Sequence, residues 1–180
     1  MKKIAILGST GSIGKTLIDI IDKDKKNFKI ILLSANKNHK SLLYQAKKFH
    51  VKNLIITNIK SYEILKIQAK KFKINVFNNY ENFNSIFPNK IDYVMSSISG
   101  IDGLEPTIKI IKHTQKIAIA NKESIICAWN IIVKELRKHN TDFVPVDSEH
   151  FSIWYAIQNN KNINVEKLYL TLGVWVASFT

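Results

Sequence analysis

The sequence predicts an α/β fold, a doubly wound parallel sheet followed by the start of a second, α+β domain. Two patterns predict it. Short apolar runs alternate with longer amphipathic stretches, as strands alternate with crossover helices, and a glycine-rich turn separates the first run from the first amphipathic stretch. With 180 residues, 46% of them hydrophobic and 23% charged, the chain has the composition of a soluble domain with one core, which excludes a disordered or fibrous protein.

Seven short apolar runs are predicted strands, and they are Lys3–Leu7, Lys29–Leu33, Asn53–Ile56, Ile74–Phe77, Asp92–Met95, Lys116–Ala120 and Asp142–Val146. Apolar residues at helical spacing predict five helices, which are Ile13–Ile21, Lys40–Phe49, Ser61–Phe72, Leu104–His113 and Glu123–Lys138. The segment Asn78–Lys90 fits either a loop or a short helix.

Polar clusters follow the ends of five predicted strands. They are Gly8–Gly14, Ser34–Asn38, Ser96–Gly100, Asn121–Ser124 and Asp147–His150. In open parallel sheets, ligands bind outside the carboxyl ends of the strands. Five clusters at that edge therefore predict one binding site.

The glycines are concentrated in two places. The chain has six, of which Gly8, Gly11 and Gly14 fall within seven residues, and Gly100 and Gly103 form a second pair. The first group is a G-x-x-G-x-x-G variant between a predicted strand and a predicted helix, where glycines let a pyrophosphate approach the helix N-terminus. We interpret it as a dinucleotide-binding turn. The alternative is a tight strand-to-helix turn without a ligand.

The residues after the second predicted strand indicate which dinucleotide binds. NAD-binding sheets usually carry Asp or Glu there to hold the ribose 2′-hydroxyl, whereas this chain has Asn36, Lys37 and Asn38. A lysine between two amides suits a 2′-phosphate, so we predict NADPH and a Rossmann-like NADP-binding domain over residues 1–145. The alternative is that Lys37 is one more of many surface lysines.

Two carboxylates predict a metal site at the start of the remaining residues, 146–180. Asp147 and Glu149 can present hard oxygen ligands to Mg²⁺, Mn²⁺ or Co²⁺, with Ser148 between them available to a substrate hydroxyl or phosphate. Lys122 and Glu123 add charged groups to the same edge of the sheet. The alternative for the Asp-x-Glu string is a solvated turn.

The formal net charge of +13 raises nucleic acid as a partner. Of the 27 basic residues, however, all but Arg137 are lysines, and these are scattered over every segment. Proteins that read nucleic acid depend on arginine for bidentate contacts. We therefore attribute the charge to the base composition of the genome, acting on surface positions, and expect no nucleic-acid partner. The alternative from another functional class is a basic nucleic-acid-binding module.

Cys127 is the one cysteine of the chain, which excludes an internal disulfide. Its apolar neighbours predict a buried thiol. Another type of NADP-dependent dehydrogenase, with Cys127 as its nucleophile, would require that thiol to be accessible. The sequence has no apolar run long enough for a membrane span and no signal peptide, so we expect a cytoplasmic protein without a membrane partner.

Four strings resemble one family in order and spacing. They are Gly8–Gly14 (GSTGSIG), Gly103–Thr107 (GLEPT), Ala120–Ser124 (ANKES) and Pro145–His150 (PVDSEH). Together they are similar to 1-deoxy-D-xylulose 5-phosphate reductoisomerase, over residues 1–171. The resemblance implies conversion of a phosphorylated sugar, 1-deoxy-D-xylulose 5-phosphate, to 2-C-methyl-D-erythritol 4-phosphate in non-mevalonate isoprenoid biosynthesis, with NADPH and a divalent metal ion.

The resemblance also implies roles for individual residues. Cofactor contacts fall on Thr10, Gly11, Ser12, Ile13, Asn36, Lys37, Asn38, Asn121 and Glu123. Substrate contacts fall on Lys122, Ser148 and Glu149, and metal ligation on Asp147 and Glu149. Members of the family are typically homodimers.

The family pattern is lost after Thr171, and residues 172–180 resemble none of it. From the sequence we expect a shifted frame or an early end, little turnover by these 180 residues alone, and a non-catalytic NADPH-binding remnant as the main alternative to an active enzyme.

Overall fold

The computed structural model describes residues 1–158, 168–172 and 175–179. The chain divides into two compact units, residues 1–147 and residues 148–180. This division falls two residues beyond the boundary expected from the sequence. The assignment of an NADP-binding domain to 1–145 and a catalytic domain to 146–180 stays a prediction.

The first unit is built on a seven-stranded sheet in which every pairing is parallel. Its strands are β1 (Lys2–Leu7), β2 (Phe28–Ala35), β3 (Asn53–Ile56), β4 (Asn75–Phe77), β5 (Ile91–Ser96), β6 (Thr114–Ile119) and β7 (Asp142–Pro145). They lie in the order β4-β3-β2-β1-β5-β6-β7. Each matches a strand predicted from the sequence, and the predicted doubly wound α/β fold is confirmed.

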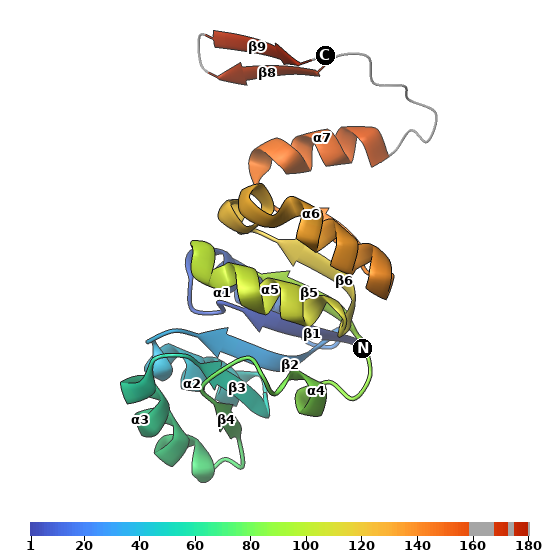
Figure 1. Ribbon diagram of the computed structural model, residues 1–180. Coiled ribbons are helices and arrows are strands. Elements are labelled where there is room, and N and C mark those ends of the chain that lie inside the picture. The colour runs from blue at the N-terminus through green and yellow to red at the C-terminus, as the bar shows by residue number, and fades with distance from the viewer. Residues whose placement is uncertain (159–167, 173–174, 180) are drawn as a thin grey trace. The chain divides into compact units, whose positions relative to one another are not determined.

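Helices cover both faces of this sheet (Figure 1). They are α1 (Ser12–Lys23), α2 (His39–Lys48), α3 (Ile59–Lys70), α4 (Phe83–Ile86), α5 (Leu104–Ile111) and α6 (Lys122–His139), with a short 3₁₀ turn, η1 (Ile101–Gly103), before α5. One core cluster joins the sheet to α1, α2 and α3, and the other joins it to α4, α5 and α6. The ambiguous segment 78–90 holds the short helix α4 within a longer loop.

Local sequence explains where these elements form. In β1 the run Ile4–Leu7 is buried throughout, as a central parallel strand with helices on both faces requires. Asparagine caps three helices: the side chains of Asn38, Asn58 and Asn121 each accept a hydrogen bond from the backbone N–H three residues later, which lowers the cost of starting the helix. The chain's many asparagines therefore include specific helix signals.

The order of the strands fixes where a ligand can bind. The chain winds outward from β1 to β4 on one side, then crosses to β5 and winds outward to β7 on the other. The crossing leaves a switch point between β1 and β5. In sheets of this kind, ligands bind at the switch point, outside the carboxyl ends of the strands.

The second unit contains α7 (Ser148–Gln158) and an antiparallel pair formed by β8 (Leu168–Leu172) and β9 (Trp175–Phe179). Within α7 the ring of Phe151 stacks on that of Tyr155, with 5.8 Å between ring centroids.

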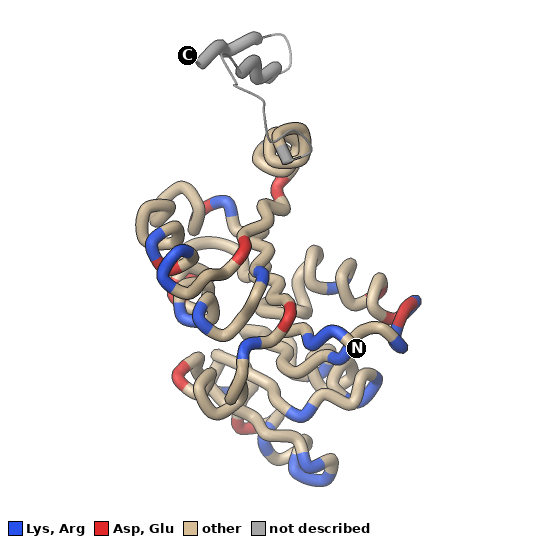
Figure 2. Tube along the Cα trace, turned by 90° about the vertical axis from the view of Figure 1, so that its right-hand side faces the viewer, with Lys and Arg blue, Asp and Glu red and all other residues tan. Residues whose placement is uncertain are grey.

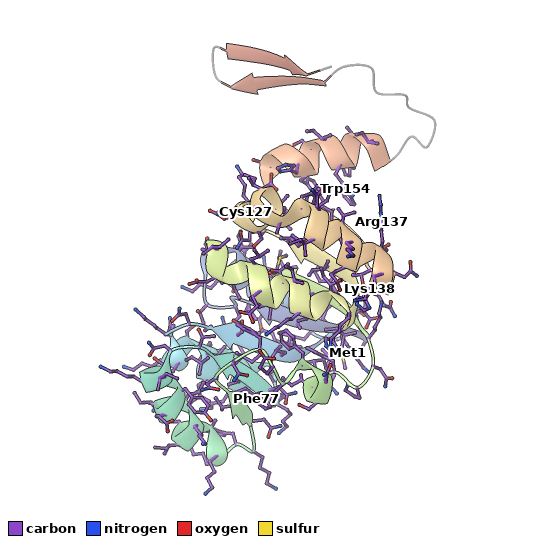
Figure 3. All side chains as sticks on the ribbon, in the orientation of Figure 1. Met1, Phe77, Cys127, Arg137, Lys138 and Trp154 are labelled. Atoms are coloured by element: carbon purple, nitrogen blue, oxygen red, sulfur yellow. The ribbon has the colours of Figure 1, made fainter. Side chains whose placement is uncertain are left out.

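The prediction that Cys127 is buried is wrong. The thiol is exposed on α6 (Figure 3). That helix turns Ile125, Ala128 and Ile132 toward the core and leaves Ile126 exposed beside Cys127. Because residues 125–129 are apolar on every side, the sequence gives no indication of which face meets the sheet.

Lys and Arg are spread along the whole trace of the first unit (Figure 2), as their distribution in the sequence predicts. No helix among the described residues is long and apolar enough to cross a membrane.

Candidate cofactor-binding site

The glycine turn after β1 lies at the switch point. Gly8 has φ +82°, in the left-handed region that favours glycine. A Cβ at this position would lie 2.7 Å from the carbonyl oxygen of Ser97, which follows β5. The backbone N–H of Ser97 donates to the carbonyl oxygen of Leu7 at 2.9 Å. Gly8 therefore allows the backbones that leave β1 and β5 to touch.

The other two glycines of the turn have different tasks. A Cβ on Gly14 would lie 2.6 Å from the Cα of Ser9, so this glycine lets α1 pack directly on the turn. A Cβ on Gly11 would meet one neighbouring atom, the Gly8 carbonyl oxygen at 3.4 Å. Gly11 is exposed and lines a cavity. Gly14 is thus required by packing, whereas Gly11 keeps space open.

The N-terminus of α1 is suited to an anion. Gly11 is the N-cap with extended backbone, and among the described residues no side chain caps this helix and no acidic residue lies in its first turn. The first N–H groups of a helix lack partners within the helix and carry partial positive charge. They are available to a phosphate group.

A buried side chain from α2 holds the turn from behind. Ser9 Oγ donates to Gln45 Oε1 at 2.8 Å, and Gln45 Nε2 donates back to the Ser9 carbonyl oxygen at 3.0 Å. The backbone N–H of Ser9 donates to the carbonyl oxygen of Ser34 in β2 at 2.8 Å. Reasoning from the sequence missed Gln45, because a glutamine within a helix carries no local signal of burial.

A cavity of about 670 Å³ opens in front of the turn. Its walls come from the segments that follow β1 to β5 and from the first turn of α5. The lining residues are Gly8, Gly11, Ala35, Asn36, Thr57, Asn78, Asn79, Tyr80, Glu81, Ser97, Ile98, Ser99, Ile101, Asp102 and Glu105. This volume is in the range of small-molecule and cofactor sites, and the expected convergence at the carboxyl ends of the strands is present for the first three polar clusters.

The wall of the cavity beside β4 is held by the half-buried side chain of Tyr80 and by Lys109, which bridges two carboxylates. Burial raises the pKa of the Tyr80 hydroxyl, which lies 3.4 Å from Ser34 Oγ. Lys109 of α5 makes ion pairs with Glu81 and Glu105, and these carboxylates raise the pKa of its ammonium group. The pairs are exposed, so they position the wall more than they stabilise the fold.

A second hollow, of about 890 Å³, adjoins the cavity and shares Asn36 and Thr57 with it. Lys37 lines this hollow together with the first turn of α3. Asn36 and Lys37, which are both predicted to contact the cofactor, therefore line the same hollow beyond β2. Asn38 caps α2 through its side chain, which accepts from the Ser41 N–H at 3.1 Å.

Asn121, after β6, is fully engaged with its own chain. Its Nδ2 donates to the carbonyl oxygens of Ile98 and Gly100, both at 2.6 Å, and its Oδ1 caps α6. Asn121 thus fixes the loop after β5, which lines the cavity, while its amide protons are already used.

The string Gly103–Thr107 has a structural explanation. Thr107 Oγ1 donates to the Gly103 carbonyl oxygen at 2.5 Å and lies 2.6 Å from Ser96 Oγ, so Ser96 is the donor of that second bond. A Cβ on Gly103 would lie 2.6 Å from the Ile98 carbonyl oxygen. This string joins the start of α5 to the end of β5.

The remaining predicted residues do not line the cavity. Ser12 and Ile13 are exposed in the first turn of α1, and Thr10 is half-buried in the turn before it. Lys122 and Glu123 are exposed in the first turn of α6, at the carboxyl end of β6.

Asp147 is half-buried after β7 and Ser148 is exposed at the start of α7. The side chain of Glu149 lies outside the described ones. No group of three His, Cys, Asp or Glu residues that could hold a metal ion occurs among the residues that the structure describes.

Sequence reasoning missed the residues that follow β3 and β4. Thr57, Asn78 and Asn79 line the cavity, and Lys60 lines the hollow. The sequence carries a signal for these residues, because polar residues directly follow both strands, as they follow the five strands with predicted polar clusters.

Comparison with known proteins identifies the family. The family model described as 1-deoxy-D-xylulose 5-phosphate reductoisomerase matches residues 4–129, which is more than half of the chain. The chain belongs to this family. A reductoisomerase of this name from Pelagibacter ubique is 60% identical over 173 residues, and one from Clostridium acetobutylicum is 37% identical over 174. These matches cover 95% of this chain and 45% of each relative.

Solved reductoisomerase structures share the fold. The enzyme from Zymomonas mobilis in complex with NADPH has a TM-score of 0.76 and 32% identity, covering 83% of this chain and 39% of that one. A reductoisomerase in complex with NADPH, fosmidomycin and magnesium also has a TM-score of 0.76, at 29% identity, covering 83% of this chain and 37% of that one. This chain therefore spans less than half the length of the relatives it matches.

Proposed function

We propose that this chain forms the NADPH-binding part of a 1-deoxy-D-xylulose 5-phosphate reductoisomerase. The observation that carries the proposal is the Gly8–Gly11 turn facing a cavity at the β1–β5 switch point, in a chain of this family. NADPH is named in the description of the Zymomonas mobilis structure, which supports the choice of cofactor.

The cofactor would lie along the carboxyl ends of β1, β2 and β5. The pyrophosphate would bind the residues of the turn and the α1 N-terminus, which are Thr10, Gly11, Ser12 and Ile13. The 2′-phosphoribose end would bind Asn36, Lys37 and Asn38. Asn121 and Glu123 would border the nicotinamide end, Asn121 chiefly by holding the loop after β5 in place.

The proposed reaction is the conversion of 1-deoxy-D-xylulose 5-phosphate to 2-C-methyl-D-erythritol 4-phosphate, a step of isoprenoid biosynthesis placed in the cytoplasm. When bound, NADPH supplies the hydride for the reductive half of this reaction. Lys122, at the carboxyl end of β6, would bind the phosphorylated sugar through its positive charge. Ser148 and Glu149 would contribute further substrate contacts, and the family's homodimeric state is part of the same proposal.

A divalent metal ion is proposed on donor chemistry and on the magnesium named with the related structures. Asp147 and Glu149 would supply hard oxygen ligands for Mg²⁺, Mn²⁺ or Co²⁺. Asp147 is the described half of that pair.

A hybrid enzyme tests the proposal. Residues 1–147 replace the matched stretch of the Zymomonas mobilis relative, and oxidation of NADPH is followed with 1-deoxy-D-xylulose 5-phosphate and Mg²⁺. The proposal predicts substrate-dependent oxidation of NADPH and formation of 2-C-methyl-D-erythritol 4-phosphate. A control hybrid carrying Lys122→Ala should fold equally well and turn over at least about a hundredfold more slowly. A folded hybrid that binds substrate but oxidises no NADPH would contradict the assignment.

A further inference from the structure

Lys60 and Lys37 line the same hollow from two neighbouring loops. Lys37 lies two residues beyond the end of β2, and Lys60 lies in the first turn of α3, just beyond β3. These strands are paired in parallel, with Ala35 opposite Ile56 at their carboxyl ends. The two loops therefore leave the sheet side by side, at the end of the cavity that adjoins Asn36.

Hydrogen bonds join the two loops to each other. Ser61 Oγ donates to the carbonyl oxygen of Lys37 at 2.9 Å, and the Asn58 N–H donates to the carbonyl oxygen of Asn36 at 3.1 Å. Ser61 is buried. The backbones that carry the two lysines are thus fixed relative to each other, although each ammonium group sits on a flexible side chain.

The hollow is positively charged. Lys37 and Lys60 are its charged lining residues, and neither makes an ion pair with a carboxylate of the described part of the chain. Asn58 and Ser61 add polar atoms beside them. Two lysine ammonium groups match a phosphate monoester, which carries close to two negative charges at neutral pH.

We propose that Lys60 is a second determinant of cofactor specificity, which binds the 2′-phosphate of NADPH from α3 while Lys37 binds it from the loop after β2. The proposal rests on the proposed function, because it requires NADPH to lie in the adjoining cavity. It assigns a role to α3, whereas the expected 2′-phosphate contacts all follow β2. The group that Lys60 would bind is a phosphate monoester on a ribose. NADH lacks this group, so Lys60 would favour NADPH over NADH.

Equilibrium binding to the whole 180-residue chain tests the proposal, with nicotinamide fluorescence as the readout and NADPH and NADH as the probes. Lys60→Ala should raise the dissociation constant for NADPH about five- to tenfold and that for NADH less than about twofold. Lys60→Arg should retain the preference for NADPH. Lys70→Ala, at the other end of α3, is the matched control and should change neither constant.

The same contrast should appear with cofactor fragments. Adenosine 2′,5′-bisphosphate should lose affinity in the Lys60→Ala variant, whereas adenosine 5′-monophosphate should not. Because Lys60 is exposed, its replacement should leave the thermal midpoint of unfolding unchanged. Equal weakening of both dinucleotides, or no change for NADPH, would overturn the role of Lys60 and leave the proposed function standing. A parent chain that binds neither dinucleotide would overturn both.

Discussion

Ser9 and Gln45 exchange two hydrogen bonds, so a helix that contacts no part of the cavity holds the glycine turn from behind. The serine hydroxyl donates to Oε1 at 2.8 Å, and Nε2 donates to the serine carbonyl oxygen at 3.0 Å. Both residues are buried. In a dry environment such a closed pair fixes the conformation of the turn, because breaking it leaves polar atoms without partners.

Replacing Gln45 tests this support. Gln45→Leu should lower the free energy of unfolding by about 1–3 kcal/mol, since the Ser9 atoms lose buried partners, and should also weaken NADPH binding by loosening the turn. Urea unfolding and a fluorescence titration measure the two effects. Gln68→Leu, on the exposed face of α3, is the control.

A double variant separates support of the turn from simple loss of packing. Ser9→Ala combined with Gln45→Leu should cost less than the sum of the two single changes, because the bond between the Ser9 hydroxyl and Gln45 Oε1 then loses both partners and leaves neither unpaired. The Ser9 carbonyl oxygen loses its Gln45 donor equally in Gln45→Leu and in the double variant. Strictly additive losses would show that the two residues do not act together.

The glycines of the turn should separate stability from binding. Gly14→Ala forces a methyl group against the backbone of Gly8 and Ser9, and should cost about 1–3 kcal/mol of unfolding free energy. Gly11→Ala places its methyl group toward the cavity, and should cost less than about 1 kcal/mol while weakening NADPH binding strongly. The reverse pattern, with Gly11→Ala unstable and still able to bind, would refute the roles assigned to the two positions.

Replacing Asn121 should lower the stability of the fold, because this side chain caps α6 and holds the loop after β5. Asn121→Ala removes the cap of α6 and two hydrogen bonds to the loop after β5, an expected loss of about 2–3 kcal/mol. Asn121→Asp keeps the cap but sets a carboxylate against the carbonyl oxygens of Ile98 and Gly100, so it should also be destabilised. Asn130→Ala, exposed on the same helix, should change little. Wild-type stability of Asn121→Ala would contradict this role.

His113 should make the fold less stable in mild acid. Burial is the main cause that lowers the pKa of its imidazole, and the charge of Lys112 lowers it further. As the pH falls through the ordinary pKa of histidine, the imidazole of the unfolded chain binds a proton before that of the folded chain does. The free energy of unfolding therefore decreases. His113→Leu should weaken this decrease between about pH 7.5 and pH 5.5 in urea unfolding, measured against His39→Leu. An identical slope in both variants would rule out His113 as a source of acid sensitivity.

Much of the fold could be predicted because buried strands and helix faces require apolar residues at regular spacing in the sequence. A strand covered on both faces, such as β1, must be a continuous apolar run, and its end is marked by the first polar or glycine residue. The glycine turn could be identified for a related reason, since Gly8 is required by its φ angle and by its contact with Ser97.

What could not be predicted depends on which face of an element meets another. Cys127 lies in a stretch that is apolar on all sides, so its exposure depends on how α6 meets the sheet. Gln45 and Lys60 are ordinary helical residues until the packing of α2 and α3 brings them to the end of β1 and to the hollow. Such roles arise from tertiary packing and not from local pattern.

Hydrogen–deuterium exchange of the 180-residue chain, with and without saturating NADPH, locates the bound cofactor. The proposed function places it at the β1–β5 switch point, between the glycine turn and the loop after β2. It predicts slower exchange in peptides covering Gly8–Gly14 and Ala35–Asn38, with no change in the C-terminal half of α6. Protection confined to other segments, or none under conditions where NADPH is bound, would contradict it.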